Sequence, residues 1–448
     1  MLGAILLLLA LTNAVHTKGK SSDPCDAELV LDPRPHSVSI TEFGAVGDGK
    51  VDNTLAFQNA VFYLKSFADK GGAQLYVPAG RWLTGSFNLT SHLTLFLGKG
   101  AVILGSHDLT LWETVDPLPS YGRGIDVPGR RYRSLINGYM LRDVVITGDN
   151  GTIDGQGSMW WDQLTNGSLK YSRPHLIEFM SSNYVIVSNL TLLNPSAYSI
   201  HPVYCSDVHV HNISITAPEE SPHTDGIVLD SSDNVCVKDS AIVVGYDSIA
   251  LKSGWDEYGI TFNRSTSDVC IRRVDLMSYS GSAIAFGSEM SGGISNIRVE
   301  QVNIHASSRG IELRTTRGRG GFIKDIIATD VVMEDVGTAF SATGQWGSHP
   351  DDDFDWNALP IVENITLRNI SGTNIGTAGK FTGIPESPFT SICLSCIQLS
   401  MSYAYSAPWT CSDVLGSSSL VFPEPCLELT SPSSCISGPR SAGKSAAS

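Results

Sequence analysis

Asp268-Val-Cys-Ile271 is one copy of a short segment that decides the fold of this chain. In every copy an Asn or Asp leads, as is typical of a turn, and mostly β-branched or other apolar residues follow in alternation. The other copies are Asp143-Val-Val-Ile, Asn183-Tyr-Val-Ile-Val, Asp207-Val-His-Val, Asn234-Val-Cys-Val, Asn296-Ile-Arg-Val, Asp325-Ile-Ile and Asn364-Ile-Thr-Leu. From the second copy along the chain to the seventh, the spacings are 24, 27, 34, 28 and 29 residues, which is a solenoid period.

The repeat predicts an all-β fold, a right-handed parallel β-helix in which each coil stacks on the one before it. A single coil cannot bury its inward face, so the stack itself forms the core. The alternative is an antiparallel sandwich or propeller, which is disfavoured because hairpin signals such as Asn-Gly between strands are scarce. Apolar residues at helical spacing follow Asp52, and we expect a helix there to cap the N-terminal end.

Four segments divide the chain. We expect a signal peptide at 1–15, an N-terminal extension at 16–40, one β-helix domain at 41–428 and a Ser/Pro/Gly-rich disordered tail at 429–448. The apolar run at the start is shorter than the ~20 residues of a membrane span, although an uncleaved anchor is the alternative. Secretion is also indicated by N-x-S/T sequons at Asn88, Asn150, Asn166, Asn189, Asn212, Asn263, Asn364 and Asn369.

Charge and cysteine content restrict the partners and the compartment. A formal net charge of -15 argues against nucleic acid as a partner but leaves an anionic substrate open. Nine cysteines fit an oxidising compartment; we expect a Cys411–Cys426 bridge, and the odd count leaves at least one thiol free or bonded to another molecule. No cluster has metal-ligand spacing, so no metal or cofactor is expected. We expect a secreted monomer with no membrane contact after signal removal.

Coil stacking predicts where chemistry can occur, because residues one period apart lie on one face about 4.8 Å apart per coil. Asp225 and Asp247 are 22 residues apart, close to one coil. Two stacked carboxylates raise the pKa of at least one of them, and a pair of carboxyl groups is what glycoside hydrolysis needs. Each Asp taken alone is more typical of a turn residue. We therefore predict Asp225 and Asp247 as catalytic residues on the strength of the whole set.

The same face carries residues suited to binding a sugar acid. Arg314 and Arg319, both in the second coil after that of Asp247, would offer guanidinium forks to carboxylates. Tyr246 fits a packing or sugar-stacking aromatic. The full set of predicted substrate-binding residues is His223, Tyr246, Lys252, Ser282, Arg314 and Arg319.

At these residues the chain resembles the polygalacturonases, pectin-degrading glycoside hydrolases, and in particular a plant group of probable polygalacturonases. The strings that carry the resemblance are Arg173-Pro-His-Leu-Ile-Glu-Phe, His201-Pro-Val-Tyr, Lys252-Ser-Gly-Trp-Asp-Glu-Tyr-Gly and Gly287-Ser-Glu-Met-Ser-Gly-Gly. The last string also occurs in exo-acting members. The resemblance implies a β-helix that cleaves α-1,4-galacturonan in pectin, in the extracellular space or cell wall, by inverting acid/base hydrolysis.

The family's four motifs are Asn-Thr-Asp, Asp-Asp, Gly-His-Gly and Arg-Ile-Lys, and all four are altered here. They read His223-Thr-Asp, Tyr246-Asp, Gly281-Ser-Ala and Glu312-Leu-Arg. By the family's assignment the water-activating carboxylates map to Asp225 and Asp247, while Tyr246 stands where the proton donor is expected.

Three routes remain open at this point. Asp247 acts as the acid with Asp225 as base, or a neighbour such as Asp256 or Glu289 supplies the carboxyl group. In the third, the protein is a catalytically weak pectin-binding β-helix. A Ca²⁺-dependent lyase on the same fold is disfavoured because no Asp-rich calcium cluster is evident.

Overall fold

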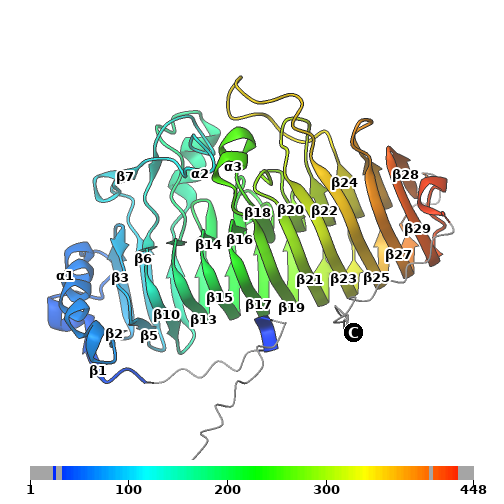
Figure 1. Cartoon of the computed structure of the whole chain (residues 1–448). Coiled ribbons are helices and arrows are strands. Elements are labelled where there is room, and N and C mark those ends of the chain that lie inside the picture. Colours follow the sequence, from blue (N-terminus) through cyan, green and yellow to red (C-terminus); the bar gives the residue numbers. More distant parts are fainter. Residues whose placement is uncertain (1–23, 27–32, 403–406, 432–448) are drawn as a thin grey trace, which may run out of the picture.

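The computed structural model describes residues 24–26, 33–402 and 407–431, and it confirms the parallel β-helix (Figure 1). Long parallel sheets run the length of the molecule, and the helices lie at one end or above one edge. The expected signal peptide at 1–15 and nearly all of the expected tail at 429–448 lie outside the described residues. In the described part of the chain, no helix is long and apolar enough to cross a membrane.

Two long sheets form the walls of the helix, and every strand pair within them is parallel. The first sheet consists of β1 (His36–Ser39), β2 (Ala73–Val77), β5 (Leu93–Leu97), β10 (Arg142–Gly148), β13 (Asn183–Leu193), β15 (Ser206–Thr216), β17 (Asp233–Val244), β19 (Thr266–Ser278), β21 (Ile294–His305), β23 (Phe322–Glu334), β25 (Ile361–Ile375), β27 (Phe389–Met401) and β29 (Val414–Phe422), with β3 (Gly80–Thr84), β6 (Ala101–Gly105) and β11 (Gly151–Asp154) joined to it. The second consists of β4 (Phe87–Asn88), β9 (Ile136–Tyr139), β12 (Ile177–Met180), β14 (Tyr198–Val203), β16 (Asp225–Asp230), β18 (Ile249–Lys252), β20 (Ser282–Phe286), β22 (Arg309–Arg314), β24 (Thr338–Thr343), β26 (Thr377–Thr382) and β28 (Trp409–Ser412).

The remaining elements are short. A small antiparallel pair joins β7 (Thr114–Val115) to β8 (Arg131–Tyr132). The helices are α1 (Thr54–Leu64), α2 (Ser158–Thr165) and α3 (Asp256–Phe262), and the 3-10 turns are η1 (Pro24–Asp26), η2 (Ile40–Phe43), η3 (Lys65–Lys70), η4 (Leu109–Leu111) and η5 (Leu427–Leu429).

The repeated Asn and Asp residues explain the first sheet. In seven of the eight copies the leading Asn or Asp has a left-handed backbone with φ between 55° and 57°, and in the second copy Tyr184 has it instead of Asn183. Asn and Asp tolerate this conformation better than other residues with a side chain. The positions stack on one another, as when the Asn364 Nδ2 donates to the Asp325 Oδ1 at 3.1 Å. Each copy therefore turns the chain at the same place in its coil.

The core lies inside the coils and is closed at the N-terminal end by α1. The β-branched residues that follow each turn are stacked in register, for example Val235 on Val269, and are buried. On α1, Phe57 is buried and stacks on Phe87 at a centroid distance of 4.6 Å. The expected capping helix is therefore present, at the blue end of Figure 1.

Two disulfides join cysteines that both lie in the described residues. Cys25 on η1 is bonded to Cys236 on β17, 211 residues further on, so the start of the described chain is fastened to the middle of the helix. The expected Cys411–Cys426 bridge is present. Cys205 is a buried thiol and Cys396 an exposed one.

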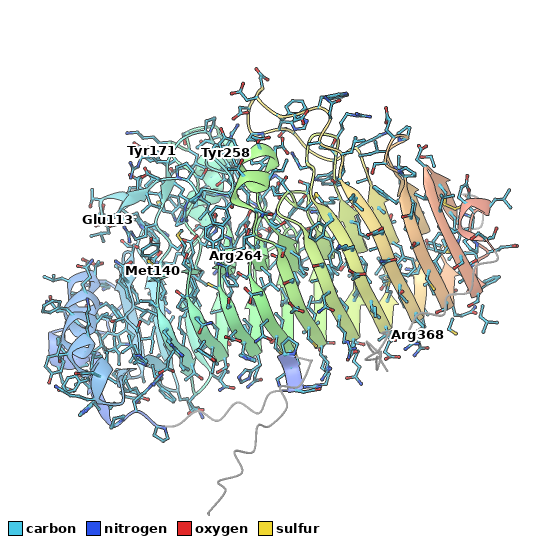
Figure 2. The ribbon with its side chains drawn as sticks, viewed as in Figure 1. Glu113, Met140, Tyr171, Tyr258, Arg264 and Arg368 are labelled. Atoms are coloured by element: carbon cyan, nitrogen blue, oxygen red, sulfur yellow. A yellow bond between two sulfur atoms is a disulfide. The ribbon has the colours of Figure 1, made fainter. Side chains whose placement is uncertain are left out.

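Loops rise over the outer face of the second sheet and enclose a space there. They include α2, α3 and the segment 344–360, which Figure 1 shows above the upper edge of the strands. Tyr171 and Tyr258 lie among these loops, whereas Arg368 projects from β25 at the opposite side (Figure 2). The candidate site is built between these loops and the sheet.

Candidate functional site

A cleft of about 340 Å³ lies between the outer face of the second sheet and the loops above it. It combines aromatic rings with both acidic and basic side chains. The residues that line it are Ile125, Asp126, Arg131, Leu164, Ser172, Arg173, His175, Ala197, Tyr198, His223, Asp225, Tyr246, Lys252, Trp255, Ser288, Glu289, Arg314, Arg319, Trp346, Gly347 and Ser348. A space of this size holds a few sugar rings at most.

Small side chains form the sheet surface beneath the cleft. Val228, Ala250 and Ala285 follow one another in register across β16, β18 and β20, and they pack with Ala197 and Tyr198 in a cluster separate from the main core. Their neighbours along each strand, such as Ile227, point the other way into that core. All three are fully buried and none of them lines the cleft, so the row lies beneath the cleft floor.

Asp225 begins β16 and lines the cleft. Its Oδ1 accepts the backbone N–H of Asp247 at 3.0 Å, and the residue is only 3% exposed. Burial, followed by the negative charge of Asp247, raises the pKa of Asp225 to about 8. The carboxyl group therefore keeps its proton at neutral pH, as a general acid must.

Asp247, in the coil after that of Asp225, is sealed from solvent. Its two carboxylate oxygens accept from Nη1 and Nη2 of Arg314 at 2.6 and 2.9 Å, which is a bidentate ion pair. The backbone N–H of Ser282 donates to the same carboxylate at 2.8 Å. Asp247 is therefore fully hydrogen-bonded and does not line the cleft.

Arg314 is shared between two buried carboxylates. Its Nε donates to Glu312 at 2.7 Å, and the Ser282 hydroxyl bridges Glu312 and Arg314 at 2.6 and 2.9 Å. The guanidinium also lies against the rings of Trp346 and Tyr246, at 4.6 and 5.4 Å from their centroids. Burial opposes its charge, but Asp247 and Glu312 raise the pKa of Arg314 above its ordinary value.

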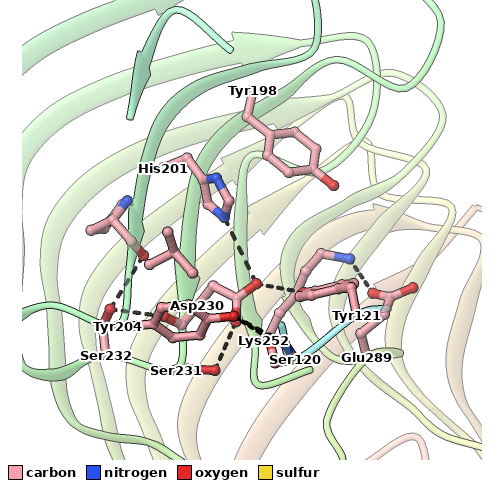
Figure 3. A network of polar contacts seen from close by, with 12 residues as sticks. Ser120, Tyr121, Tyr198, His201, Tyr204, Asp230, Ser231, Ser232, Lys252 and Glu289 are labelled. Carbon is pink, nitrogen blue, oxygen red and sulfur yellow. Dashed lines mark hydrogen bonds and ion pairs between the residues drawn. The ribbon is translucent and has the colours of Figure 1, made fainter. Parts of the chain in front are cut away.

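Lys252 and Glu289 form an ion pair on the cleft wall (Figure 3). Burial disfavours both charges, yet Lys252 and Arg319 hold the pKa of Glu289 down at about 2. In return Glu289, with Tyr198 and Asp225, raises the pKa of Lys252 above its ordinary value in spite of burial. Glu289 is thus an ionised carboxylate in the same cleft as the protonated Asp225.

The rim is formed by His223 and Tyr246, whose ring centroids are 4.9 Å apart. His223 is exposed and has a left-handed backbone with φ 46°. Burial raises the pKa of Tyr246 to about 12, so its phenol is a poorer proton donor than an ordinary tyrosine.

A buried network supports the cleft from below. His201 on β14 lies between Glu178 and Asp230, with its Nδ1 3.2 Å from Glu178, and the Tyr121 hydroxyl donates to Asp230 (Figure 3). Burial opposes the charge of His201, but the two carboxylates raise its pKa. The network fixes β12, β14 and β16 relative to the loop that carries Tyr121.

One group in the described residues has donor atoms close enough for a metal ion next to the cleft. It consists of His175, Glu178 and His201, whose ligand atoms lie within 4.8 Å of one another. Both Glu178 oxygens, however, accept from Nη1 of Arg131 at 2.8 Å. The guanidinium already supplies the positive charge there, so the group does not fit a cation well.

Six of the eight residues predicted from the sequence line the cleft: His223, Asp225, Tyr246, Lys252, Arg314 and Arg319. Asp247 and Ser282 are adjacent but buried beneath it. Arg319 is held by Asp256, Ser288 and Ser348. Asp126, Trp255 and Trp346 also line the cleft but are not among the residues predicted from the sequence. They lie on loops outside the repeat, and no periodic signal marks them.

Comparison with known proteins gives a consistent result. Residues 74–420 match the family model of the glycosyl hydrolases family 28. A probable polygalacturonase of Vitis vinifera is 48% identical over 430 residues, covering 96% of this chain and 87% of the relative. An exopolygalacturonase of Thermotoga maritima has a similar fold, with a TM-score of 0.74 at 24% identity over 85% of this chain and 90% of that one. The polygalacturonase of Erwinia carotovora has a TM-score of 0.69 at 19% identity, over 88% and 99% of the two chains.

Proposed function

This chain belongs to the glycosyl hydrolases of family 28, and from that membership we propose that it hydrolyses α-1,4-linked galacturonosyl units of pectin with inversion. One observation carries the proposal: Asp225 is a carboxyl group on the cleft surface whose pKa of about 8 keeps it protonated. It supplies the acid that Tyr246 cannot. None of the routes left open by the sequence makes Asp225 the proton donor. We replace the first of them, in which Asp247 is the acid and Asp225 the base, because Asp247 is sealed from solvent and Asp225 lines the cleft.

The proton moves from Asp225 to the glycosidic oxygen as the bond from that oxygen to C1 breaks. A water molecule forms the new bond to C1 from the opposite face of the ring, as inversion requires. Glu289 is the ionised carboxylate that we assign to orienting this water and accepting its proton. With its low pKa Glu289 passes that proton to solvent, and Asp225 is reprotonated from solvent. Asp247 does not touch substrate; its charge holds the proton on Asp225.

The test is the release of reducing ends from pectin by purified protein. We expect Asp225→Asn to lower kcat by about 10²–10⁴-fold, the usual cost of losing a general acid. Asp69→Asn is the matched control, because Asp69 is exposed on η3 beside the capping helix and should leave the rate unchanged. Equal rates for wild type and Asp225→Asn would remove Asp225 from the mechanism.

The second candidate function is binding of wall glycan with little turnover. The burial of Asp247 under Arg314 favours it, because the second aspartate predicted from the sequence cannot reach a substrate. Saturable binding of pectic oligosaccharides together with an absence of product after prolonged incubation would select this candidate over hydrolysis.

We further propose that the mature protein is a secreted monomer of the cell wall. The support is the apolar N-terminal run, the eight sequons and two disulfides, which persist in oxidising compartments. A fluorescent fusion should reach the apoplast, and removal of residues 1–15 should retain it in the cell. Light scattering of the purified protein should give the mass of a single chain.

A further inference from the structure

Every cationic side chain that lines the cleft already has a carboxylate partner. Lys252 pairs with Glu289, and the other four are arginines. Arg131 contacts Glu178, Arg173 contacts Asp126, Arg314 contacts Asp247 and Glu312, and Arg319 contacts Asp256. These are short contacts between side chains that are largely buried, so they persist at ordinary ionic strength.

The donors of Arg173 and Arg314 are used up as well as their charges. Arg173 donates from Nε and Nη2 to Asp126 and from Nη1 to the carbonyls of Ser196 and Pro222, at 2.8 to 3.1 Å. Arg314 has four donor contacts with its partners, and the rings of Trp346 and Tyr246 lie against its guanidinium. Neither guanidinium has the free fork that recognises a carboxylate in two parallel hydrogen bonds.

The charges of the cleft also sum to no excess of positive charge. Six partner carboxylates accompany the five cations, and Arg309 approaches Glu312 from outside at 3.4 Å. An anionic sugar entering this space would lose its hydration without gaining a counterion, which is costly in a buried site. An uncharged sugar meets no such cost.

The rest of the lining suits an uncharged ring. Trp255, Trp346, Tyr198 and Ala197 give the walls apolar surface. Such surfaces pack against the apolar face of a pyranose or against a methyl group, whereas they give a carboxylate nothing to bind.

We propose that the cleft binds a sugar unit without a free carboxylate, so that its substrate is a pectic chain whose units are methyl-esterified or neutral at this subsite. The inference rests on the proposed function for the identity of the polymer, but it makes a separate claim about charge. Glu312 is central to it, because this acid occupies one of the positions where the family motif has a cation, and it holds Arg314 in place.

Binding tests the claim independently of turnover. Asp225→Asn protein is titrated by calorimetry with three probes: a galacturonate oligosaccharide, its fully methyl-esterified form, and a galactose oligosaccharide of equal length. We expect the ester to bind at least tenfold more tightly than the free acid, with little change when NaCl is raised. Equal or tighter binding of the free acid overturns the proposal, as does an absence of binding by all three. Equal binding of ester and galactose probes identifies a neutral-sugar subsite, and weaker binding of galactose identifies the ester as the ligand; both support the proposal.

A variant pair adds a readout that a merely structural effect would not give. Glu312→Gln keeps an acceptor for Arg314 but removes one negative charge that Arg314 and Arg309 now face, so it should shift the preference toward the free acid by tenfold or more. Glu386→Gln is the matched control, since Glu386 pairs with Arg317 outside the cleft lining and is 59% exposed. An unchanged preference in Glu312→Gln would contradict the assignment.

Turnover separates this inference from the proposed function. If wild-type protein releases reducing ends from de-esterified polygalacturonate faster than from methyl-esterified chains, the charge inference is wrong and the hydrolase stands. If neither polymer is cleaved while the ester probe binds selectively, the hydrolase fails and the charge inference stands.

Discussion

Replacing Asp225 by Asn should stabilise the folded protein at alkaline pH while it removes activity. Asparagine imitates the protonated carboxyl group: its Oδ1 can accept the N–H of Asp247 as Asp225 does at 3.0 Å, and it never ionises. In the wild type, by contrast, the folded state must either keep the proton of Asp225 or bury a second negative charge beside Asp247.

The size of the effect follows from the two pKa values. Asp225 titrates near its ordinary value of 3.8 when unfolded and at about 8 when folded. Because the folded pKa is raised, the unfolded state releases its proton first, and the free energy of unfolding falls by about 1.4 kcal/mol per pH unit between these values. The loss reaches about 6 kcal/mol at pH 8 and stays constant above it. Asp225→Asn has no carboxyl group to titrate, so between these two pKa values its free energy of unfolding rises relative to that of the wild type.

Denaturant unfolding of both proteins at pH 4, 6, 8 and 9, followed by tryptophan fluorescence, measures the difference. Other titrating groups are common to both proteins and cancel. We expect similar stability at pH 4 and a growing advantage for the variant up to pH 8, with Asp69→Asn behaving as wild type. Parallel stability curves from pH 4 to 9 would refute the raised pKa, and with it the assignment of Asp225 as the acid.

Three further outcomes are expected. Arg314→Ala should cost about 3–5 kcal/mol of stability, because it leaves Asp247 and Glu312 buried without their counterion; calorimetric melting checks this, and a melting temperature within a degree of wild type would contradict it. Tyr246→Phe should keep kcat within a few-fold of wild type, because a phenol with a pKa of about 12 donates no proton in the mechanism; a loss of 10²-fold or more in the reducing-end assay would restore Tyr246 as the acid. Cys25→Ser should cost about 2–5 kcal/mol by opening the bridge to Cys236, whereas the control Cys396→Ser, at an exposed thiol, should leave the urea midpoint unchanged.

The fold could be predicted because it depends on local rules that repeat. In each coil an Asn or Asp adopts a left-handed backbone and turns the chain, and the alternating β-branched residues after it form a strand. In the copy that begins at Asn183 the pattern is displaced by one residue, since the left-handed residue there is its neighbour Tyr184. The Cys25–Cys236 bridge was not foreseen, because spacing along the chain contains no information about which coil the N-terminal segment crosses.

The site was predictable only in part. Period arithmetic brought Asp225, Asp247 and Arg314 together, and the structure has them in mutual contact or in adjacent positions. The same arithmetic could not tell which of them faces the cleft, because a shift of one residue at a turn moves a side chain from the surface to the interior. The spacing also could not predict that Trp255 and Trp346 line the cleft, because they lie on loops that the repeat does not position.

The altered motifs are better understood together than one at a time. A glutamate at position 312 needs a cation, and it shares Arg314 with Asp247. Shared in this way, Arg314 neutralises Asp247 only in part, so the remaining negative charge, added to burial, raises the pKa of Asp225. Glu312 therefore has two effects. It occupies Arg314, so that no free cation faces the cleft, and it helps to keep a proton on Asp225. On this argument Glu312→Gln should lower the alkaline limit of the pH–rate profile as well as shift the preference toward the free acid, and the two effects should appear in the same variant.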